Sequence, residues 1–340
     1  MRIAQVAPPW YPIPPPSYGG IESMLALLVD GLIARGHDVV LFATGETDSQ
    51  ADVRFSFSRA QSDRVGAALP EVLHAAWVAN NLDREEFDLI HDHSLAGPLL
   101  AGGSTTSTVV TAHGPLDGEF ARYYELINPW VHLVAISDAQ RRMAPSLHWV
   151  RTVYNGMDTD GYPFEADKED YVLWMGRMNP DKGAHLAIDI ARKAGCRIVL
   201  AGKCTEQAER DYFEEEISPR LGDGAEWTGE ADLDRKKILL AHARCLLFPL
   251  QWEEPFGIVM AEAMACGTPV VALGRGSVPE VVVDGVTGFV RREPAELVQA
   301  LDDVDQIDPK ECRRMAEERF GADVMVSAYE RVYEEVLGRA

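Results

Sequence analysis

Two repeating patterns of apolar residues divide most of this chain. Short apolar runs alternate with longer segments in which apolar residues recur every three or four positions. The runs predict buried strands, and the longer segments predict amphipathic helices. Predicted strands cover residues 3–7, 39–43, 87–91, 109–112, 131–136, 152–154, 171–175, 198–201, 226–228, 245–250, 270–273 and 288–290. Predicted helices cover residues 21–35, 70–81, 184–194, 206–217, 235–243, 255–267, 295–301, 309–320 and 323–338. This alternation indicates an α/β fold with parallel sheets.

The chain is too long for one hydrophobic core. Its 340 residues exceed the usual size of a single domain, and 46% of them are hydrophobic, which is enough for two cores. Between residues 156 and 170 the periodicity stops, and a glycine, a proline and several acidic residues accumulate. This composition is typical of a linker. We therefore predict two domains, covering residues 1–163 and 168–320.

Residues 251–271 carry the most informative part of the pattern. They lie between two apolar runs, so they predict a helix that connects two parallel strands. Pro255 suits the first turn of that helix, and Gly267 stands where a left-handed residue ends it. Glu254 precedes the helix, and Glu262 lies about two turns further along it.

Both glutamates indicate polar ligands at the carboxyl end of the preceding strand, where parallel sheets bind ligands. The free amides of Phe256, Gly257 and Ile258 would attract a phosphate, because a helix N-terminus is electropositive. Carboxylates beside a phosphate suggest a hydroxyl-rich ligand, such as a sugar and a ribose. The alternative is that Glu254 caps the helix and Glu262 lies on a solvated face.

A loop with two cations follows the predicted strand 171–175. Residues 176–183 include Arg177 and Lys182, in a chain whose net charge is −22. An acidic protein that binds a diphosphate must concentrate its cations locally. Arg offers a bidentate fork and Lys a point charge, so the pair predicts a diphosphate site. A solvated surface loop is the alternative.

Composition limits the partners and the compartment. A net charge of −22 argues against nucleic acid and against electrostatic docking on an anionic membrane. No segment approaches the ~20 apolar residues of a membrane span, and residues 3–7 read as a strand rather than as part of a signal peptide. We expect a cytoplasmic protein without strong membrane attachment. The five scattered cysteines form no Cys-x2-Cys pair, which predicts buried thiols in a reducing compartment and no zinc site.

A long loop, residues 8–20, separates the first predicted strand from the first helix. Its run of prolines at 14–16 predicts a stiff, extended segment. Gly19 and Gly20 stand at the helix start, where a missing Cβ lets backbone amides approach a phosphate, although a simple turn is the alternative. The aromatic residues of the loop either stack on an acceptor sugar or pack the loop onto its own domain. They are Trp10, Tyr11 and Tyr18.

Polar residues follow several predicted strands of the first half. His93 follows the strand 87–91, and His113 follows the strand 109–112. This rim is where doubly wound sheets bind ligands. A single histidine there usually has a structural role, so the pattern alone leaves its function open.

Several of these segments resemble the family 4 glycosyltransferases. The segment Glu254-Pro-Phe-Gly-x4-Glu262-Ala-Met-Ala-x-Gly-x-Pro-Val-Val is similar to the Glu-x7-Glu signature of that family. Gly-Arg177-x4-Lys182-Gly is similar to its second signature. The resemblance covers nearly the whole chain and is strongest between residues 171 and 290.

The resemblance implies roles for the residues of the second half. Glu254 would contact hydroxyls of the donor sugar, and Glu262 would hold the ribose. The amides of residues 256–258 would contact the sugar and the phosphate. Arg177 and Lys182 would stabilise the leaving diphosphate.

Two elements of the first half are also similar to the family. Residues 19–22, Gly-Gly-Ile-Glu, match an element that lies against the donor phosphates, which assigns Gly19 and Gly20 to phosphate binding. Thr111-x-His113-Gly matches a segment whose histidine faces the donor sugar. His113 is therefore the best catalytic candidate in this half.

The resemblance implies a fold and a reaction as well. The expected fold is GT-B, with two doubly wound Rossmann-like domains facing each other across a cleft and a last helix, about 323–340, crossing back onto the first. The expected reaction transfers a sugar, with retention, from a nucleotide-sugar donor to a hydroxyl of a small-molecule or glycan acceptor. UDP is the commonest carrier in the family. Front-side attack, with the leaving diphosphate as base, requires neither cofactor nor metal.

Two segments depart from the family pattern. Arg275 and Ser277 alter the glycine spacing in residues 275–280, which would otherwise contact the phosphates and the sugar. Lys203 and Cys204 replace a glycine-rich turn. The nucleotide base therefore stays open.

Other classes fit parts of the pattern. A nucleotide-sugar epimerase would use the same site without an acceptor. A metal-dependent GT-A transferase would need Asp-x-Asp at a strand end, whereas Asp232 and Asp234 stand at a helix start and Asp158 and Asp160 in the linker. A sugar-binding protein without activity would not need the two cations.

Overall fold

The computed structural model describes residues 1–16 and 19–339, and its chain forms two compact units. Unit 1 comprises Met1–Met157 together with the C-terminal segment that begins at Ala322. Unit 2 comprises Asp158–Gly321.

The first boundary falls earlier in the chain than residue 163, where the sequence pattern placed the end of the first domain. The segment after Met157 already belongs to unit 2, because its polar groups bond there. The hydroxyl of Tyr162 donates to Oε1 of Glu262 at 2.7 Å, and the guanidinium group of Arg313 donates to the carbonyl of Tyr162 at 2.9 Å. The loss of apolar periodicity between residues 156 and 170 therefore indicated a segment without regular secondary structure, and it did not locate the boundary between the units.

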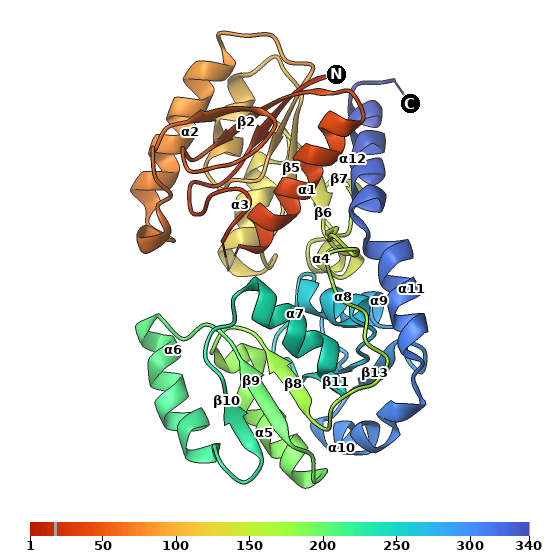
Figure 1. The fold of residues 1–340 in the computed structure, drawn as a ribbon. Coiled ribbons are helices and arrows are strands. Elements are labelled where there is room, and N and C mark those ends of the chain that lie inside the picture. Colours follow the sequence, from red (N-terminus) through yellow and green to blue (C-terminus); the bar gives the residue numbers. More distant parts are fainter. Residues whose placement is uncertain (17–18, 340) are drawn as a thin grey trace. The chain divides into compact units, whose positions relative to one another are not determined.

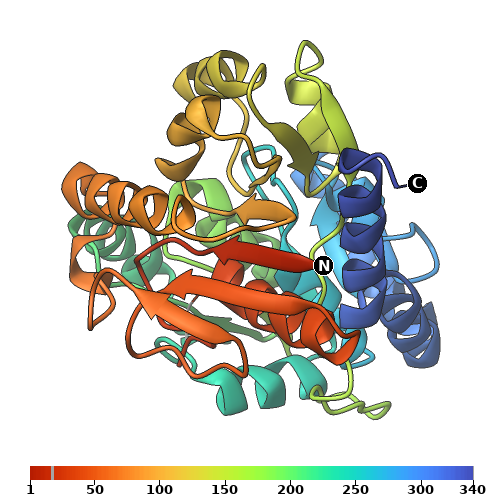
Figure 2. The same cartoon turned by 90° about the horizontal axis from the view of Figure 1, so that it is seen from above.

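Unit 1 is built on a parallel sheet, of which Figure 1 labels β2, β5, β6 and β7. Its described strands follow the order β3-β2-β1-β4-β5-β6-β7. Figure 2 shows β1 and β2 side by side, as their pairing of Ile3 with Val39 requires. The order reverses between β1 and β4, which is the switch point where doubly wound sheets bind ligands. The strands are β1 (Arg2–Val6), β2 (Asp38–Ala43), β3 (Asp52–Phe55), β4 (Leu89–Asp92), β5 (Thr108–Ala112), β6 (His132–Ala135) and β7 (Trp149–Thr152).

Strand alternation decides which helices cover each face of this sheet. Odd-numbered strand residues such as Ile3 and Leu89 pack in one buried cluster with α1 and α12, whereas even-numbered residues such as Ile90 pack with α2. Helices α1 and α12 lie side by side (Figure 1), and a Cβ at Gly31 would come within 2.5 Å of Val326. The helices of unit 1 are α1 (Gly20–Ala34), α2 (Ala68–Leu82), α3 (Gly118–Ile127), α4 (Asp138–Met143) and α12 (Ala322–Val336).

Unit 2 repeats this architecture with described strands in the order β10-β9-β8-β11-β12-β13. Its order reverses between β8 and β11. The strands are β8 (Val172–Met175), β9 (Ile198–Ala201), β10 (Ala225–Trp227), β11 (Cys245–Phe248), β12 (Val270–Leu273) and β13 (Gly288–Arg291). The helices are α5 (Ala184–Lys193), α6 (Gln207–Tyr212), α7 (Leu233–His242), α8 (Ile258–Ala265), α9 (Val278–Val281), α10 (Pro294–Asp303) and α11 (Pro309–Phe320).

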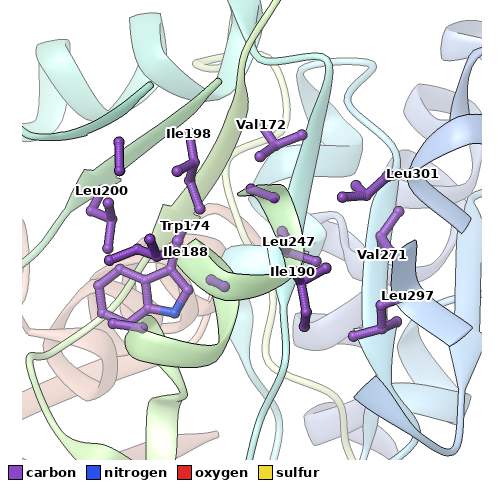
Figure 3. Close-up of a cluster of buried hydrophobic side chains, with 14 of the residues drawn as sticks. Val172, Trp174, Ile188, Ile190, Ile198, Leu200, Leu247, Val271, Leu297 and Leu301 are labelled. Atoms are coloured by element: carbon purple, nitrogen blue, oxygen red, sulfur yellow. The ribbon is translucent and has the colours of Figure 1, made fainter. Parts of the chain in front are cut away.

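Apolar side chains of this second sheet meet those of α5 and α10 in a continuous core. Trp174 and Leu200 from the strands lie against Ile188 of α5, and Val271 lies against Leu297 of α10 (Figure 3). The core fixes the strands whose carboxyl ends carry the polar residues described below.

Most predicted elements are confirmed, with shifts of a few residues at their ends. The predicted strand 152–154 lies earlier, as β7, and the predicted helix 206–217 divides into α6 and a π-helical turn, Phe213–Ile217. The pattern missed β3, α3, α4 and α9, which are short or carry few buried residues. Among the described residues, no helix is long and apolar enough to cross a membrane.

Candidate functional site

Glu254 lies in the loop that follows β11, at the switch point of unit 2. Its side chain is buried, and the ammonium group of Lys182 donates to its Oε2 atom at 2.6 Å. The indole nitrogen of Trp252 donates to the same oxygen at 3.1 Å. The Lys182 ammonium also lies 4.5 Å from the centre of the Trp252 ring, a cation–π distance. Glu254 is thus held in a buried ion pair.

The backbone around Glu254 is supported by the segment 275–277. Gly276 adopts φ +56°, and a Cβ there would lie 2.2 Å from the carbonyl oxygen of Glu254. The amide of Ser277 donates to that carbonyl at 2.9 Å, and its hydroxyl donates to the carbonyl of Phe256 at 2.8 Å. This segment, for which we expected ligand contacts, therefore holds the Glu254 loop in shape.

Helix α8 begins later than the sequence indicated. Gly257 is its N-cap, with φ +72°, and no side chain caps it. Pro255 precedes the helix instead of standing in its first turn, so that prediction is wrong. Glu254 is not a helix cap. Among the described residues, the amides of Gly257 and Ile258 donate to no backbone acceptor, which leaves them available to an anion. Gly267 is left-handed as predicted, with φ +74°.

Lys182 and Arg177 lie in the loop that follows β8, the strand next to β11. Two hydrogen bonds hold this loop: the Trp174 indole donates to the carbonyl of Lys182 at 3.0 Å, and the amide of Gln251 donates to the carbonyl of Asp181 at 2.8 Å. The second bond joins the β8 and β11 loops directly. Strand order thereby brings Lys182 to Glu254.

Arg177 differs from Lys182 in its surroundings. Its side chain is half-buried, and within the described part of the chain it forms no ion pair and no side-chain hydrogen bond. Lys203, and to a lesser extent Arg177, lower the pKa of the nearby Glu206 carboxyl, but the planar fork of donors of Arg177 makes no hydrogen bond there and can bind an anionic ligand.

Glu262 lies on α8 and is buried. Its Oε1 atom accepts hydrogen bonds from the hydroxyl of Tyr162, at 2.7 Å, and from the ammonium group of Lys236. Its Oε2 atom is buried and has no donor among the described residues. A carboxylate oxygen without a donor is costly when buried, so this atom suits a ligand hydroxyl. The solvated-face alternative for Glu262 is wrong.

His113 follows β5 in unit 1 and is only partly exposed. Its Nε2 atom lies 2.9 Å from Nδ1 of His93, which in turn lies 3.1 Å, through Nε2, from the side-chain oxygen of Gln5. Burial lowers the pKa of His113 to about 4, so the ring is neutral at pH 7. His93 follows β4, which borders the switch point of this sheet, and His113 follows the neighbouring strand β5.

Gly19 and Gly20 stand where α1 begins. Gly19 has φ +154°, and a Cβ there would lie 2.8 Å from Pro15, so the loop folds closely over the helix start. Burial raises the pKa of Glu22, in the first turn, to about 7. The loop is also fixed to its own unit, because the amide of Ile13 donates to the Thr47 hydroxyl at 3.2 Å. Trp10 and Tyr11 are half-buried, and Tyr18 lies outside the described residues.

The two Asp-x-Asp segments have local roles. Asp232 caps α7 by accepting the amide of Arg235 at 2.8 Å. Asp158 accepts the amide of Gly161 at 3.1 Å, and the exposed Asp160 pairs with Arg313. Neither segment follows a strand.

The sequence pattern did not single out five residues that bond, directly or through another side chain, to candidate residues of their own unit. A buried tyrosine in a linker or a glutamine inside an apolar strand is an anomaly that could have drawn attention to some of them. No local pattern could have paired them with their partners. The missed residues are Trp252, Tyr162, Lys236, Gln5 and Tyr333.

Comparison with known proteins places this architecture. Two family models match: Glycosyltransferase Family 4 over residues 18–160 and Glycosyl transferases group 1 over residues 162–319. The phosphatidyl-myo-inositol mannosyltransferase of Mycolicibacterium smegmatis is 28% identical over 390 residues, covering 99% of this chain and 95% of the relative. A glycogen synthase of Mycobacterium tuberculosis is 26% identical, covering 93% of this chain and 88% of the relative.

Solved structures agree. AviGT4, a glycosyltransferase involved in avilamycin A biosynthesis, matches with a TM-score of 0.76 and 27% identity, covering 100% of this chain and 99% of that one. HepE of Anabaena matches with a TM-score of 0.75 and 20% identity over 97% of this chain and 98% of its own, a likeness of fold.

The two doubly wound sheets and these matches define a glycosyltransferase of the GT-B class. The chain belongs to the group 1 and family 4 glycosyltransferases. This assignment confirms the predicted fold class and enzyme class, and it displaces the epimerase and GT-A alternatives.

Proposed function

We propose that this glycosyltransferase moves a sugar from a nucleoside-diphosphate donor to an acceptor hydroxyl, with retention of anomeric configuration and without a metal ion. UDP is the first carrier to test. Small molecules and glycans are the acceptor classes. Soluble, cytoplasmic action is part of the proposal.

One observation carries the proposal. In unit 2, Lys182 and Glu254 form an ion pair at 2.6 Å, whereas in the described part of the chain Arg177 forms no ion pair or side-chain hydrogen bond and Oε2 of Glu262 has no donor. A nucleoside diphosphate supplies both missing partners, because it presents phosphate oxygens and ribose hydroxyls in one molecule. A neutral sugar would satisfy only the carboxylate.

The roles follow from these groups. Arg177, Lys182 and the α8 amides would stabilise the negative charge that develops on the leaving diphosphate, at a few kcal/mol for each preorganised donor. Glu262 would accept a ribose hydroxyl, and Glu254 a hydroxyl of the transferred sugar. From unit 1, Gly19 and Gly20 would contact the phosphates.

Retention is proposed through front-side attack. Lys182 and Trp252 both donate to Oε2 of Glu254 and hold this carboxylate in place, and the proposed path gives it no covalent role. His113, a neutral ring, would contact the transferred sugar. The leaving phosphate would then take the proton of the acceptor hydroxyl, so the proposed path needs no covalent sugar–enzyme bond.

A donor screen tests the proposal. Calorimetry with UDP-, GDP- and dTDP-sugars identifies the carrier, and NMR of the product identifies the anomer. We expect a product with the donor's anomeric configuration and full activity in EDTA. An inverted product contradicts retention, and activity lost in EDTA and restored by Mn²⁺ contradicts metal independence.

A further inference from the structure

A chain of buried hydrogen bonds crosses unit 1 from α12 to the carboxyl end of β5. Its strand members occupy odd-numbered positions of β1, β4 and β5, or the position just beyond them, and therefore face α12. Register places Gln5 opposite His91. In order from the helix end, the members are Tyr329, Thr111, His91, Tyr333, Gln5, His93 and His113.

Every link has ordinary hydrogen-bond length. The Tyr329 and Thr111 hydroxyls lie 3.0 Å apart, Thr111 lies 2.8 Å from Nε2 of His91, and Nδ1 of His91 lies 2.8 Å from the Tyr333 hydroxyl. The Gln5 amide then lies 3.1 Å from the Tyr333 hydroxyl and 3.1 Å from Nε2 of His93. The last link joins Nδ1 of His93 to Nε2 of His113 at 2.9 Å. The side chains act as one unit, because each hydroxyl, amide or ring that donates in one direction must accept from the other.

The number of protons limits how this chain can be arranged. Burial lowers the pKa of His113 to about 4 and the pKa values of His91 and His93 well below the usual range, so each ring is neutral and carries one N–H. Each hydroxyl also has one proton, and Gln5 directs one N–H along the chain. Seven members thus supply seven protons to six links. One proton is therefore left over. It must point outward from one end of the chain, because a second proton within any link would break that hydrogen bond.

The two ends are not equivalent. In the structure Nε2 of Gln5 faces Tyr333 and Oε1 faces His93, and this direction leaves the extra proton at the Tyr329 end. Tyr329 is 0% and Thr111 2% exposed. Neither has another acceptor in the described residues, so a hydroxyl proton there stays unbonded, which is unfavourable for a buried donor.

A half-turn of the Gln5 amide exchanges its oxygen and nitrogen and reverses every link. The extra proton then lies on Nδ1 of His113, the one partly exposed member of the chain. Water or a ligand can accept it there. The reversed direction therefore avoids the buried unbonded donor and is the more stable of the two.

We propose that this chain fixes His113 as the tautomer with its proton on Nδ1, so that the ring donates a hydrogen bond at the carboxyl edge of the sheet. Gln5, Tyr333 and His93 are positioning residues for that donor. The partner of the donor is an oxygen acceptor, such as a hydroxyl or ring oxygen of the sugar. Its use in transfer rests on the proposed function, whereas the tautomer itself does not.

NMR of the ring nitrogens tests the proposal on the full-length free protein. Histidines are labelled with ¹⁵N, long-range ¹H–¹⁵N correlations separate protonated from unprotonated nitrogens, and His113→Gln assigns the signals. We expect a protonated Nδ1 and an unprotonated Nε2 at His113 near pH 7.5. The opposite pattern overturns the proposal, whatever the enzyme's activity.

Two tyrosines on the same helix provide a matched pair. Tyr333→Phe cuts the chain between the buried end and Gln5, so the amide loses its preferred direction, and the His113 signals should move toward the average of both tautomers. Tyr329→Phe removes an equally buried hydroxyl but leaves the chain from Thr111 to His113 intact, so its signals should match the wild type. Equal shifts in both variants, or none in either, would overturn the proposal. Absence of sugar transfer with the expected ring pattern would instead count against the proposed function.

Discussion

Removing the cation of the Lys182–Glu254 pair should destabilise unit 2 strongly. The two side chains are 17% and 8% exposed, and their charges lie 2.6 Å apart. Coulomb attraction at an effective dielectric constant of about 20 amounts to about 6 kcal/mol, which the cost of desolvation offsets in part. Lys182→Met leaves the carboxylate buried, with the Trp252 N–H as its one donor among the described side chains. Loss of one partner of such a pair costs about 3–5 kcal/mol.

The double variant makes this prediction sharper. Glu254→Gln removes the buried charge, and its amide oxygen can still accept from Trp252. Lys182→Met/Glu254→Gln should therefore be more stable than Lys182→Met alone by at least about 1 kcal/mol, although it carries one more substitution. Glu226→Gln, which breaks an exposed pair of unit 2 at 3.4 Å, is the control and should change stability by less than about 1 kcal/mol.

Calorimetry measures these effects because it can resolve the transitions of two units. A loss of 3 kcal/mol should lower the midpoint of the unit 2 transition by roughly 6–12 °C. A midpoint for Lys182→Met within a degree or two of the wild type would contradict the prediction. The prediction also fails if the double variant loses the sum of the single losses, because the two groups would then not interact.

Three further predictions follow from the same structure. Arg177→Ala should weaken UDP binding about tenfold, which corresponds to the loss of about 1.4 kcal/mol of charge-assisted contact. Its melting temperature should not change. Equal UDP affinity of the variant and the wild type in calorimetry would remove Arg177 from the site. Glu262→Gln should weaken the binding of UDP and of UDP-sugar by similar factors. Glu254→Gln should instead lower kcat/KM for the donor and leave the binding of free UDP nearly intact. The same pattern of binding and kcat/KM in both variants would contradict separate roles for the two glutamates. Burial raises the pKa of Glu22 from 4.5 to about 7, so the folded protein holds this proton more tightly than the unfolded chain does. The contribution of Glu22 to stability is therefore fully present below pH 4.5 and is lost as the pH rises through 7. Glu22→Gln stays neutral and should gain stability relative to the wild type between pH 5 and pH 8, by up to about 3 kcal/mol; melting curves with a constant difference would show that Glu22 ionises normally.

Local patterns were sufficient for most strands and helices and for the loops of the candidate site, but they missed β3, α3, α4 and α9. Apolar runs and helical periodicity report burial over one strand or one helix, and the left-handed Gly267 reports a helix end, because both properties depend on neighbouring residues alone. The same reasoning misplaced Pro255. A left-handed Gly257 delays the start of α8. Glycine is required there because a Cβ would lie 2.7 Å from Met260 and 3.1 Å from Glu254.

The partners within the site were decided by tertiary structure. Lys182 and Glu254 are 72 residues apart and meet because β8 and β11 are neighbours in the sheet. Gln5 and Tyr333 are 328 residues apart and meet because α12 packs on the odd-numbered face of unit 1. Sequence patterns measure separation along the chain, whereas these contacts depend on strand order, register and helix packing. The sequence by itself determined which groups could carry chemistry, and only the fold decided which of them are already paired and which are left for a ligand.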